Sequence, residues 1–230
     1  RELDLVRVKG KHQAIAIYQP LGLIDQLPPQ IVAATERYHL ALAAYRQQRW
    51  DEAAQALSAA AQKNPTAPDA LVNLAAMYVE NGNFDAAQPV LDQALARAPQ
   101  HVDAHVIATN LRLSKGLFAE AENWAERSLG LMQQAGGAMG GTADSQLNLS
   151  LALLTFGRLQ QGWPLHESRY APGRQSRNAG GVPVFPFALP MWQGEPLQGK
   201  TILLMPEQGH GDQIQFVRYT QQLKELGATV

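Results

Sequence analysis

The stretch PDALVNLAAMYVENGNFDAAQPVLDQALARAPQH, residues 68–101, carries the pattern from which the architecture of the chain follows. The same kinds of residue recur 34 positions earlier, in residues 34–67. Leucine, alanine or proline stands at matching places in both stretches: Leu40 with Leu74, Ala41 with Ala75, Ala53 with Ala87, Leu57 with Leu91, Ala60 with Ala94 and Pro65 with Pro99. A fixed offset that holds at so many places indicates an internal repeat.

Each repeat unit predicts two amphipathic helices. Apolar residues recur at steps of three and four, and a turn signal such as Asn81-Gly82-Asn83 separates the two halves. The matched alanines are small enough to let the helix backbones approach closely, while Leu57 and Leu91 fill the space between helices. The proline ends the second helix, because it cannot continue the helical hydrogen bonding.

Two further units continue the pattern with changes. The unit at 102–135 keeps Gly116, Phe118, Ala121 and Ala125 but has Ser128 for the alanine and Gln133 for the proline. A glycine-rich stretch then interrupts the period, and a divergent unit follows at 143–170. Its matching residues are Leu149, Ser150, Leu153, Gly157 and Leu159, with Gly162 where an alanine is expected.

Residues 34–170 resemble the tetratricopeptide repeat (TPR). The resemblance implies a mainly α fold, a helix-turn-helix solenoid whose units share one core and whose first helices line a groove. Such grooves bind extended or helical peptides, so the predicted partner is a protein or peptide.

Asn73 and Asn148 stand at the same place in two of the groove-lining helices. An asparagine amide can both donate to and accept from a peptide backbone without reading its sequence. Repeats of the O-linked N-acetylglucosamine transferase resemble this arrangement, although His39 and Ile107 occupy the place in the other two units. The alternative is that both asparagines are solvated or satisfy a neighbouring turn.

Composition excludes several classes of function. Lys and Arg total 19 against 20 Asp and Glu, so the net charge of -1 disfavours nucleic acid and anionic membranes as partners. The absence of cysteine excludes disulfides, thiolate zinc sites and a cysteine nucleophile. No apolar run approaches the ~20 residues that cross a bilayer. We therefore expect a cytoplasmic protein without a cofactor.

The C-terminal segment has a different pattern. A linker rich in proline and glycine at 171–199 leads to a buried-strand pattern at Lys200–Met205, a glycine loop, an amphipathic helix and a second strand pattern at 227–230. This order predicts an incomplete Rossmann-like β-α-β start at 200–230. The loop would lie at the sheet edge, where ligands bind, and comprises Glu207, Gln208, Gly209 and Gly211. Asp212 after it is either a helix N-cap or an acid/base group.

A second resemblance concerns residues 160–230. Gly162-Trp163, the stretch 192–197 and EQGHGDQIQFVRY at 207–219 resemble bacterial TPR-linked glycosyltransferases, whose catalytic part is similar to the heptosyltransferases. The resemblance implies that Asp212 deprotonates the acceptor hydroxyl and that a sugar nucleotide binds a second Rossmann-like half, which this chain lacks. His210 departs from the apolar residue usual there. We therefore expect this fragment to be inactive and a full-length parent to be a glycosyltransferase.

Residues 1–20 predict a β-hairpin with strands at 3–9 and 12–19 around Lys9-Gly10-Lys11. The string RELDLVRVKGKHQAIAIY resembles the last hairpin of class III adenylate/guanylate cyclases. That resemblance implies that Lys9 contacts the phosphates of a nucleoside triphosphate in an intact cyclase, whereas an exposed turn lysine is the alternative in this chain. Residues 21–33 are interpreted as a linker.

These observations lead to one functional hypothesis with two alternatives. The chain is interpreted as a TPR peptide-binding module, the targeting arm of a TPR-linked glycosyltransferase. The first alternative is the full-length glycosyltransferase with Asp212 as base, and the second is a TPR region downstream of a nucleotide cyclase. Both ends interrupt a strand-like pattern, so a piece of a longer protein is expected.

Overall fold

The structure is a computed structural model of the chain, and it describes residues 2–6, 15–18, 27–134, 141–171, 189–205 and 210–230. The chain divides into two compact units, Arg1–Ala171 and Pro172–Val230. None of the described helices is both long and apolar enough to cross a membrane.

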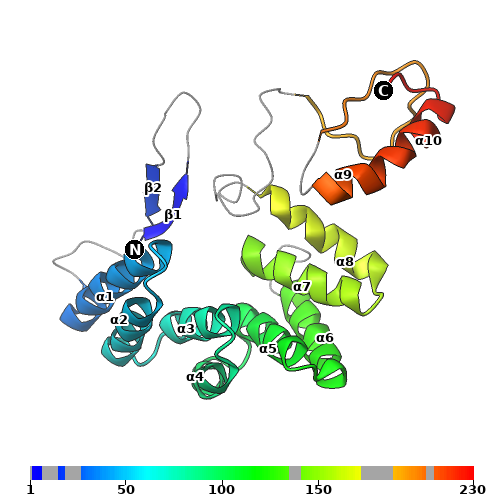
Figure 1. The fold of residues 1–230 in the computed structure, drawn as a ribbon. Coiled ribbons are helices and arrows are strands. Elements are labelled where there is room, and N and C mark those ends of the chain that lie inside the picture. Colours follow the sequence, from blue (N-terminus) through cyan, green and yellow to red (C-terminus); the bar gives the residue numbers. More distant parts are fainter. Residues whose placement is uncertain (1, 7–14, 19–26, 135–140, 172–188, 206–209) are drawn as a thin grey trace. The chain divides into compact units, whose positions relative to one another are not determined.

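Helices of the first unit follow one another in antiparallel pairs (Figure 1). Contacts join the two helices of each pair, and they also join α3 to α5 and α5 to α7. The first helices α3, α5 and α7 therefore lie side by side, and the described part of this unit is a mainly helical TPR-like solenoid. The pairs are α1 (Pro29–Arg46) with α2 (Trp50–Lys63), α3 (Asp69–Glu80) with α4 (Phe84–Arg97), α5 (Val102–Ser114) with α6 (Phe118–Gln134), and α7 (Ala143–Thr155) with α8 (Leu159–His166), which continues into the short 3-10 helix η2 (Glu167–Tyr170).

The turn inside each pair has one geometry. Its central residue takes a left-handed φ of +72° at Gly82, +73° at Gly116 and +74° at Gly157, and of +58° at Gln48 in the first pair. The next residue then donates its N–H to the carbonyl five positions back, as Asn83 does to Tyr78 at 2.8 Å. This hydrogen bond closes the end of a helix, and glycine suits the left-handed position because it has no Cβ.

The small-residue crossings predicted from the repeat are confirmed. Ala53, Ala87, Ala94 and Ala121 are all 0% exposed, and Leu91 is fully buried among them. One core cluster draws residues from α2 to α5, a second from α1, α2 and α3, and a third from α5 to α8. Each cluster spans neighbouring pairs, so the pairs share one core.

The divergent fourth pair packs differently at its crossing. A Cβ added to Gly162 would lie 2.8 Å from Cγ and Cδ2 of the Leu154 side chain, closer than carbon atoms normally approach. The helices α7 and α8 thus come too close for the alanine that the other pairs hold there. This close approach explains why glycine replaces alanine.

Leu40 differs from its repeat partner Leu74. Leu74 is 2% exposed and packs against residues of α1 and α2, whereas Leu40 on α1 is 57% exposed. The difference follows from position, because within the described residues no helix pair precedes α1 to cover it.

The first twenty residues contain β1 (Glu2–Val6) and β2 (Ile15–Tyr18), which pair antiparallel with Val6 opposite Ile15. The turn predicted at Lys9-Gly10-Lys11 lies outside the described residues. The resemblance to a cyclase hairpin therefore stays a prediction.

In the second unit, the buried strand predicted at Lys200–Met205 is not formed. Thr201 makes a single parallel bridge to Thr229, and Leu203, Leu204 and Met205 are 55%, 47% and 39% exposed. A parallel strand is buried only between neighbours in a covered sheet, and the described residues of this unit supply one bridge and no sheet. Between the bridged residues lie α9 (His210–Phe216), the 3-10 helix η4 (Val217–Tyr219) and α10 (Thr220–Glu225).

The predicted amphipathic helix of this unit is present as these three short pieces, but its apolar side chains do not pack. Ile214 is 76% exposed, Phe216 54% and Val217 62%. The Rossmann-like start expected at 200–230 is therefore not supported, because its helix has no sheet to cover.

Candidate functional site

The first helices of three successive pairs each carry one stripe of mostly half-buried or exposed side chains, and Ile107 on α5 is the exception because it is buried in the core. On α3 the stripe residues are half-buried or exposed, while Leu71, Leu74 and Ala75 on the other side are buried. The corresponding residues of α5 and α7 stand at the same places of the repeat, and contacts join α3 to α5 and α5 to α7. We call the three stripes together the open face: Asp69, Asn73, Ala76 and Glu80 on α3; Asp103, Ile107, Asn110 and Ser114 on α5; Asp144, Asn148, Leu151 and Thr155 on α7.

Both predicted groove asparagines lie on the open face and are exposed. The Nδ2 of Asn73 donates to the Tyr38 hydroxyl of α1 at 3.0 Å, so one amide hydrogen is used between neighbouring pairs. Ile107 stands between the two asparagines on α5 and is 9% exposed. The row of amides is thus interrupted at the middle helix, and the amide of Asn73 is oriented by Tyr38.

Polar contacts between successive pairs hold the helices in their relative orientation. The Tyr45 hydroxyl donates to Oε2 of Glu80 at 2.7 Å, between the first and second pairs. Thr142, before α7, donates through its backbone N–H to Oδ1 of Asp103 at 3.3 Å. Single exposed contacts of this kind stabilise little, about 0–1 kcal/mol. Their effect here is to fix where Glu80 and Asp103 stand on the open face.

A charged contact also joins the second helices of the last two pairs. Arg158 donates to Oε1 of Glu122 at 3.0 Å and contacts Oε1 of Glu126. These hydrogen bonds to two carboxylates raise the pKa of the Arg158 guanidinium. Arg158 therefore stays charged and ties the start of α8 to α6.

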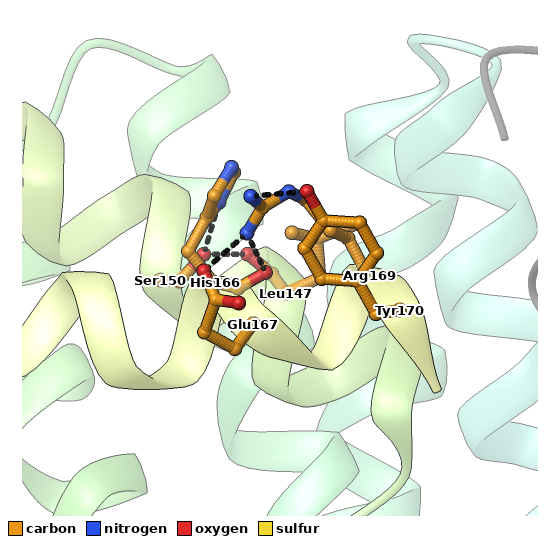
Figure 2. A network of polar contacts seen from close by, with 6 residues as sticks. All are labelled: Leu147, Ser150, His166, Glu167, Arg169 and Tyr170. Carbon is orange, nitrogen blue, oxygen red and sulfur yellow. Dashed lines mark hydrogen bonds and ion pairs between the residues drawn. The ribbon is translucent and has the colours of Figure 1, made fainter. Parts of the chain in front are cut away.

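Figure 2 shows a polar network that closes the fourth pair. Oγ of Ser150 lies 2.6 Å from the Leu147 carbonyl oxygen and 3.2 Å from Nδ1 of His166. Arg169 donates to the His166 carbonyl at 3.0 Å and to the Tyr170 hydroxyl at 2.9 Å, and its guanidinium lies 4.1 Å from the centre of the Tyr170 ring.

The serine and histidine of this network are not placed for nucleophilic catalysis. The Ser150 hydroxyl donates its hydrogen to the Leu147 carbonyl, so the ring nitrogen of His166 must donate to Ser150 rather than accept its proton. Ser150 is also 0% exposed, which keeps any substrate away. The first two pairs hold alanine and leucine at these places, Ala41 with Leu57 and Ala75 with Leu91, and the polar pair of the fourth holds α8 against α7.

A buried histidine joins α5 to the end of α4. Nε2 of His105 lies 2.8 Å from the Pro99 carbonyl oxygen, its ring packs on Trp124 at 5.0 Å between centres, and its buried Nδ1 has no hydrogen-bond partner. Burial lowers the pKa of His105 below its ordinary value. The described residues hold no group of three acidic or histidine side chains that could bind a metal ion.

Most of the remaining predicted site residues lie outside the part of the chain that the structure describes. Lys9, Glu207, Gln208 and Gly209 lie outside the described residues, and so does the side chain of Asp212 within α9. Gly211 lies in α9 and is exposed. The choice between N-cap and acid/base group for Asp212 stays a prediction.

Comparison with known proteins decides what the helical array is. The family model of the tetratricopeptide repeat matches residues 44–105 and 78–136. Residues 44–136 are tetratricopeptide repeats. These TPR units comprise α3 to α6 with the adjoining α2, and they include the Asn73 part of the open face.

Similar proteins have been found in bacteria, plants and yeast. Protein FlbA of Caulobacter vibrioides is 28% identical over 178 residues, which cover 77% of this chain and 28% of FlbA. The Arabidopsis OM64 TPR domain is 19% identical, with a TM-score of 0.47, over 56% of this chain and 98% of that domain. The TPR2B domain of yeast Sti1, in a complex with pHsp70, is 15% identical, with a TM-score of 0.46, over 54% of this chain and 98% of that chain. The chain thus spans about a quarter of the length of FlbA.

Sequence reasoning missed two features of the open face. The first is the row of aspartates at the start of α3, α5 and α7, although the repeat offset that matched the leucines also places Asp69 against Asp103. The second is Tyr38, whose contact with Asn73 joins residues 35 positions apart. The aspartates could have been found by extending the repeat alignment to polar residues.

Proposed function

We propose that the TPR array binds an extended segment of another polypeptide on the open face. The observation that carries this proposal is the set of aligned stripes on α3, α5 and α7, helices that are otherwise packed into the shared core. The stripe on α7 includes Leu151, a large apolar side chain that is 49% exposed. A surface that mixes exposed amides and an exposed leucine on a rigid array suits a peptide better than a small molecule.

The spacing of the two asparagines limits the length of the bound segment. Helix axes in contact lie about 8–10 Å apart, so two helix steps separate Asn73 from Asn148 by roughly 16–20 Å. An extended chain advances about 3.3 Å per residue, which places roughly five or six residues between the two amides. In this proposal each amide pairs with the peptide backbone, and Tyr38 holds Asn73 in the orientation that it needs.

Peptide affinity tests the proposal. The double variant Asn73→Ala with Asn148→Ala should bind array-selected 15-residue peptides about tenfold more weakly, because two hydrogen bonds of about 0.7 kcal/mol each are lost. A matched control removes two exposed amides of second helices, Gln93→Ala with Asn123→Ala, and should change nothing. An unchanged peptide affinity of the asparagine variant would show that the two asparagines do not contact the peptide. If the array selects no peptide at all, the proposed binding function is refuted.

We propose further that the array is the targeting arm of a TPR-linked glycosyltransferase. The resemblance of residues 160–230 supports this, with Asp212 as the acceptor base and the sugar nucleotide bound only in a full-length parent. The alignment with FlbA over 178 residues is longer than the stretch 29–170 occupied by the array. At least part of the flanking sequence therefore occurs beside similar repeats in a relative.

The glycosyltransferase proposal has its own test. In a full-length parent, Asp212→Asn should abolish transfer from a sugar nucleotide while leaving the thermal unfolding temperature unchanged. Transfer that survives this substitution would remove Asp212 from the proposed role. The cyclase alternative with Lys9 stays a prediction, since no described residue favours it.

A further inference from the structure

Two histidines stand four residues apart at the start of α5, and the second of them is buried. His105 is 5% exposed, and its Nε2 lies 2.8 Å from the carbonyl oxygen of Pro99 in the turn after α4. A carbonyl oxygen only accepts, so Nε2 carries the ring hydrogen and Nδ1 holds a lone pair. Nδ1 is buried and has no hydrogen-bond partner among the described residues. A proton on Nδ1 would therefore place a charged donor in the interior without an acceptor.

The first histidine, His101, caps the same helix through its ring. As the N-cap residue of α5, it accepts the N–H of Ala104 at its Nδ1, at 3.4 Å. A protonated imidazole donates from both nitrogens, so protonation of His101 removes this acceptor and the cap with it. Protonation also adds positive charge at the end of the helix where the helix dipole is already positive. Both rings therefore hold the start of α5 through an Nδ1 that carries no hydrogen.

The surroundings of His105 oppose its protonation. Burial is the largest influence and lowers the pKa of His105, whereas the hydrogen bond to Pro99 raises it. The charges of Arg127 and His101 lower the pKa of His105 further. Arg127 lies on α6 with its guanidinium 5.6 Å from the centre of the Trp124 ring, and the His105 ring packs on the same tryptophan at 5.0 Å. The folded position of His105 thus favours the neutral ring.

Two carboxylates near the start of α5 are engaged by other residues. Oε2 of Glu120 on α6 lies 3.5 Å from Nε of Arg112, a residue of α5 itself. Oδ1 of Asp103 accepts from the N–H and the hydroxyl of Thr142. The residues that α3 and α4 contribute to the core cluster beside α5 are apolar. Neither carboxylate acts on the pKa of His105.

We propose that His101 and His105 form a pH-sensitive joint between the second and third helix pairs, in which protonation of the two rings releases the start of α5 from the turn after α4 while the other pairs stay folded. In the open form His105 meets water and binds a proton more readily than in the closed form, so the open form gains population as the pH falls. One segment can open ahead of the whole fold because stability differs along a structure. The joint is independent of the proposed peptide binding.

Amide hydrogen exchange of the complete 230-residue chain, followed residue by residue by NMR, tests the joint. After correction for the intrinsic exchange rate, the opening constant of the amides at 105–108 should rise about fivefold to tenfold between about pH 7.5 and 5.5, because one histidine that is protonated only in the open form contributes at most a factor of about ten over this range. Low concentrations of urea separate the joint from global unfolding, since the effect of urea scales with the surface that is exposed. The opening constant at 105–108 should hardly change with urea, whereas that of the amides at 74–77 in α3 should rise steeply.

Three substitutions assign the effect to its residues. His105→Gln keeps a donor for the Pro99 carbonyl but does not titrate, so the rise at 105–108 should be lost. His101→Asn keeps a helix cap at every pH and should lower the opening constant at pH 5.5 by about fivefold. The control His39→Gln removes a histidine of α1 and should retain the full rise. If His105→Gln does not fold by circular dichroism, the pH and urea dependences of the unchanged chain decide.

Each of four results would overturn the inference. An opening constant at 105–108 that stays the same down to pH 5.5 would show that no proton drives the opening. Equal opening constants with equal urea dependence at 105–108 and 74–77 would show that only the whole fold opens. A full rise in the His105→Gln variant would assign the proton to another group. An unchanged opening constant of the His101→Asn variant at pH 5.5 would remove the cap from the joint.

Discussion

The turn inside the first helix pair holds a residue that its geometry disfavours, and replacing it should stabilise the protein. Gln48 has a φ of +58°, in the left-handed region where Gly82, Gly116 and Gly157 occupy the other three turns. A side chain with a Cβ costs about 1–2 kcal/mol in that region. Glycine avoids this cost but loses more backbone entropy on folding, about 0.5–1 kcal/mol. Gln48→Gly should therefore stabilise by about 0.5–1 kcal/mol.

Two companion substitutions fix the sign of this effect. The converse change Gly82→Gln should destabilise by a similar amount, and because a Cβ at Gly82 would meet no atom within 4 Å, the cost comes from the backbone alone. Gln47, next to Gln48, has an ordinary φ of -95°. Gln47→Gly should therefore destabilise by about 0.5–1 kcal/mol, through chain entropy without any relief of strain.

Thermal unfolding followed by circular dichroism measures all three variants. A gain of 0.5–1 kcal/mol corresponds to a rise in Tm of about 1–4 °C for a domain of this size. Gln48→Gly should raise Tm, while Gly82→Gln and Gln47→Gly should lower it. A lower Tm for Gln48→Gly would show that the four turns do not share one backbone geometry.

Two further substitutions test the core. Leu91→Ala should lower the free energy of unfolding in urea by about 3–5 kcal/mol, because Leu91 is 0% exposed and the alanines around it cannot fill the cavity. The control Leu95→Ala should cost far less, since Leu95 is only half-buried. Equal costs for the two substitutions would refute the shared core. Burial lowers the pKa of His105 below the ordinary 6.5, so the unfolded chain binds the proton more readily than the folded one. The free energy of unfolding should therefore fall as the pH drops below 6.5, by at most about 1.4 kcal/mol per pH unit. The variant His105→Gln should lose this part of the pH dependence, while its amide can still donate to the Pro99 carbonyl. A pH profile identical to that of the unchanged chain would contradict the role of His105.

Most of the helical array can be predicted from the sequence, because its determinants are local and periodic. A repeat offset of 34 residues places Ala53 and Ala87 at helix crossings, and both are fully buried. The position of Gly162 was recognised as a departure from the repeat, but its reason is the approach of α7 to α8, which no single helix reveals.

The candidate site was predicted only in part, because contacts between pairs cannot be obtained from one unit. Asn73 and Asn148 could be placed by their repeat positions, whereas the Tyr38 contact depends on how α1 packs beside α3. The strand expected at Lys200–Met205 failed for a related reason. Its apolar pattern indicates a preference for burial, and burial requires a sheet that the described residues of the second unit do not form.

The central claim is that the open face of the TPR array binds a polypeptide segment. Methyl resonances of leucine and valine, recorded by NMR while an array-selected 15-residue peptide is added, test it most directly. We predict a shift at Leu151 on α7, with none at Val90 on α4 or Leu129 on α6. Shifts confined to Val90 and Leu129, with Leu151 unchanged, would contradict the claim.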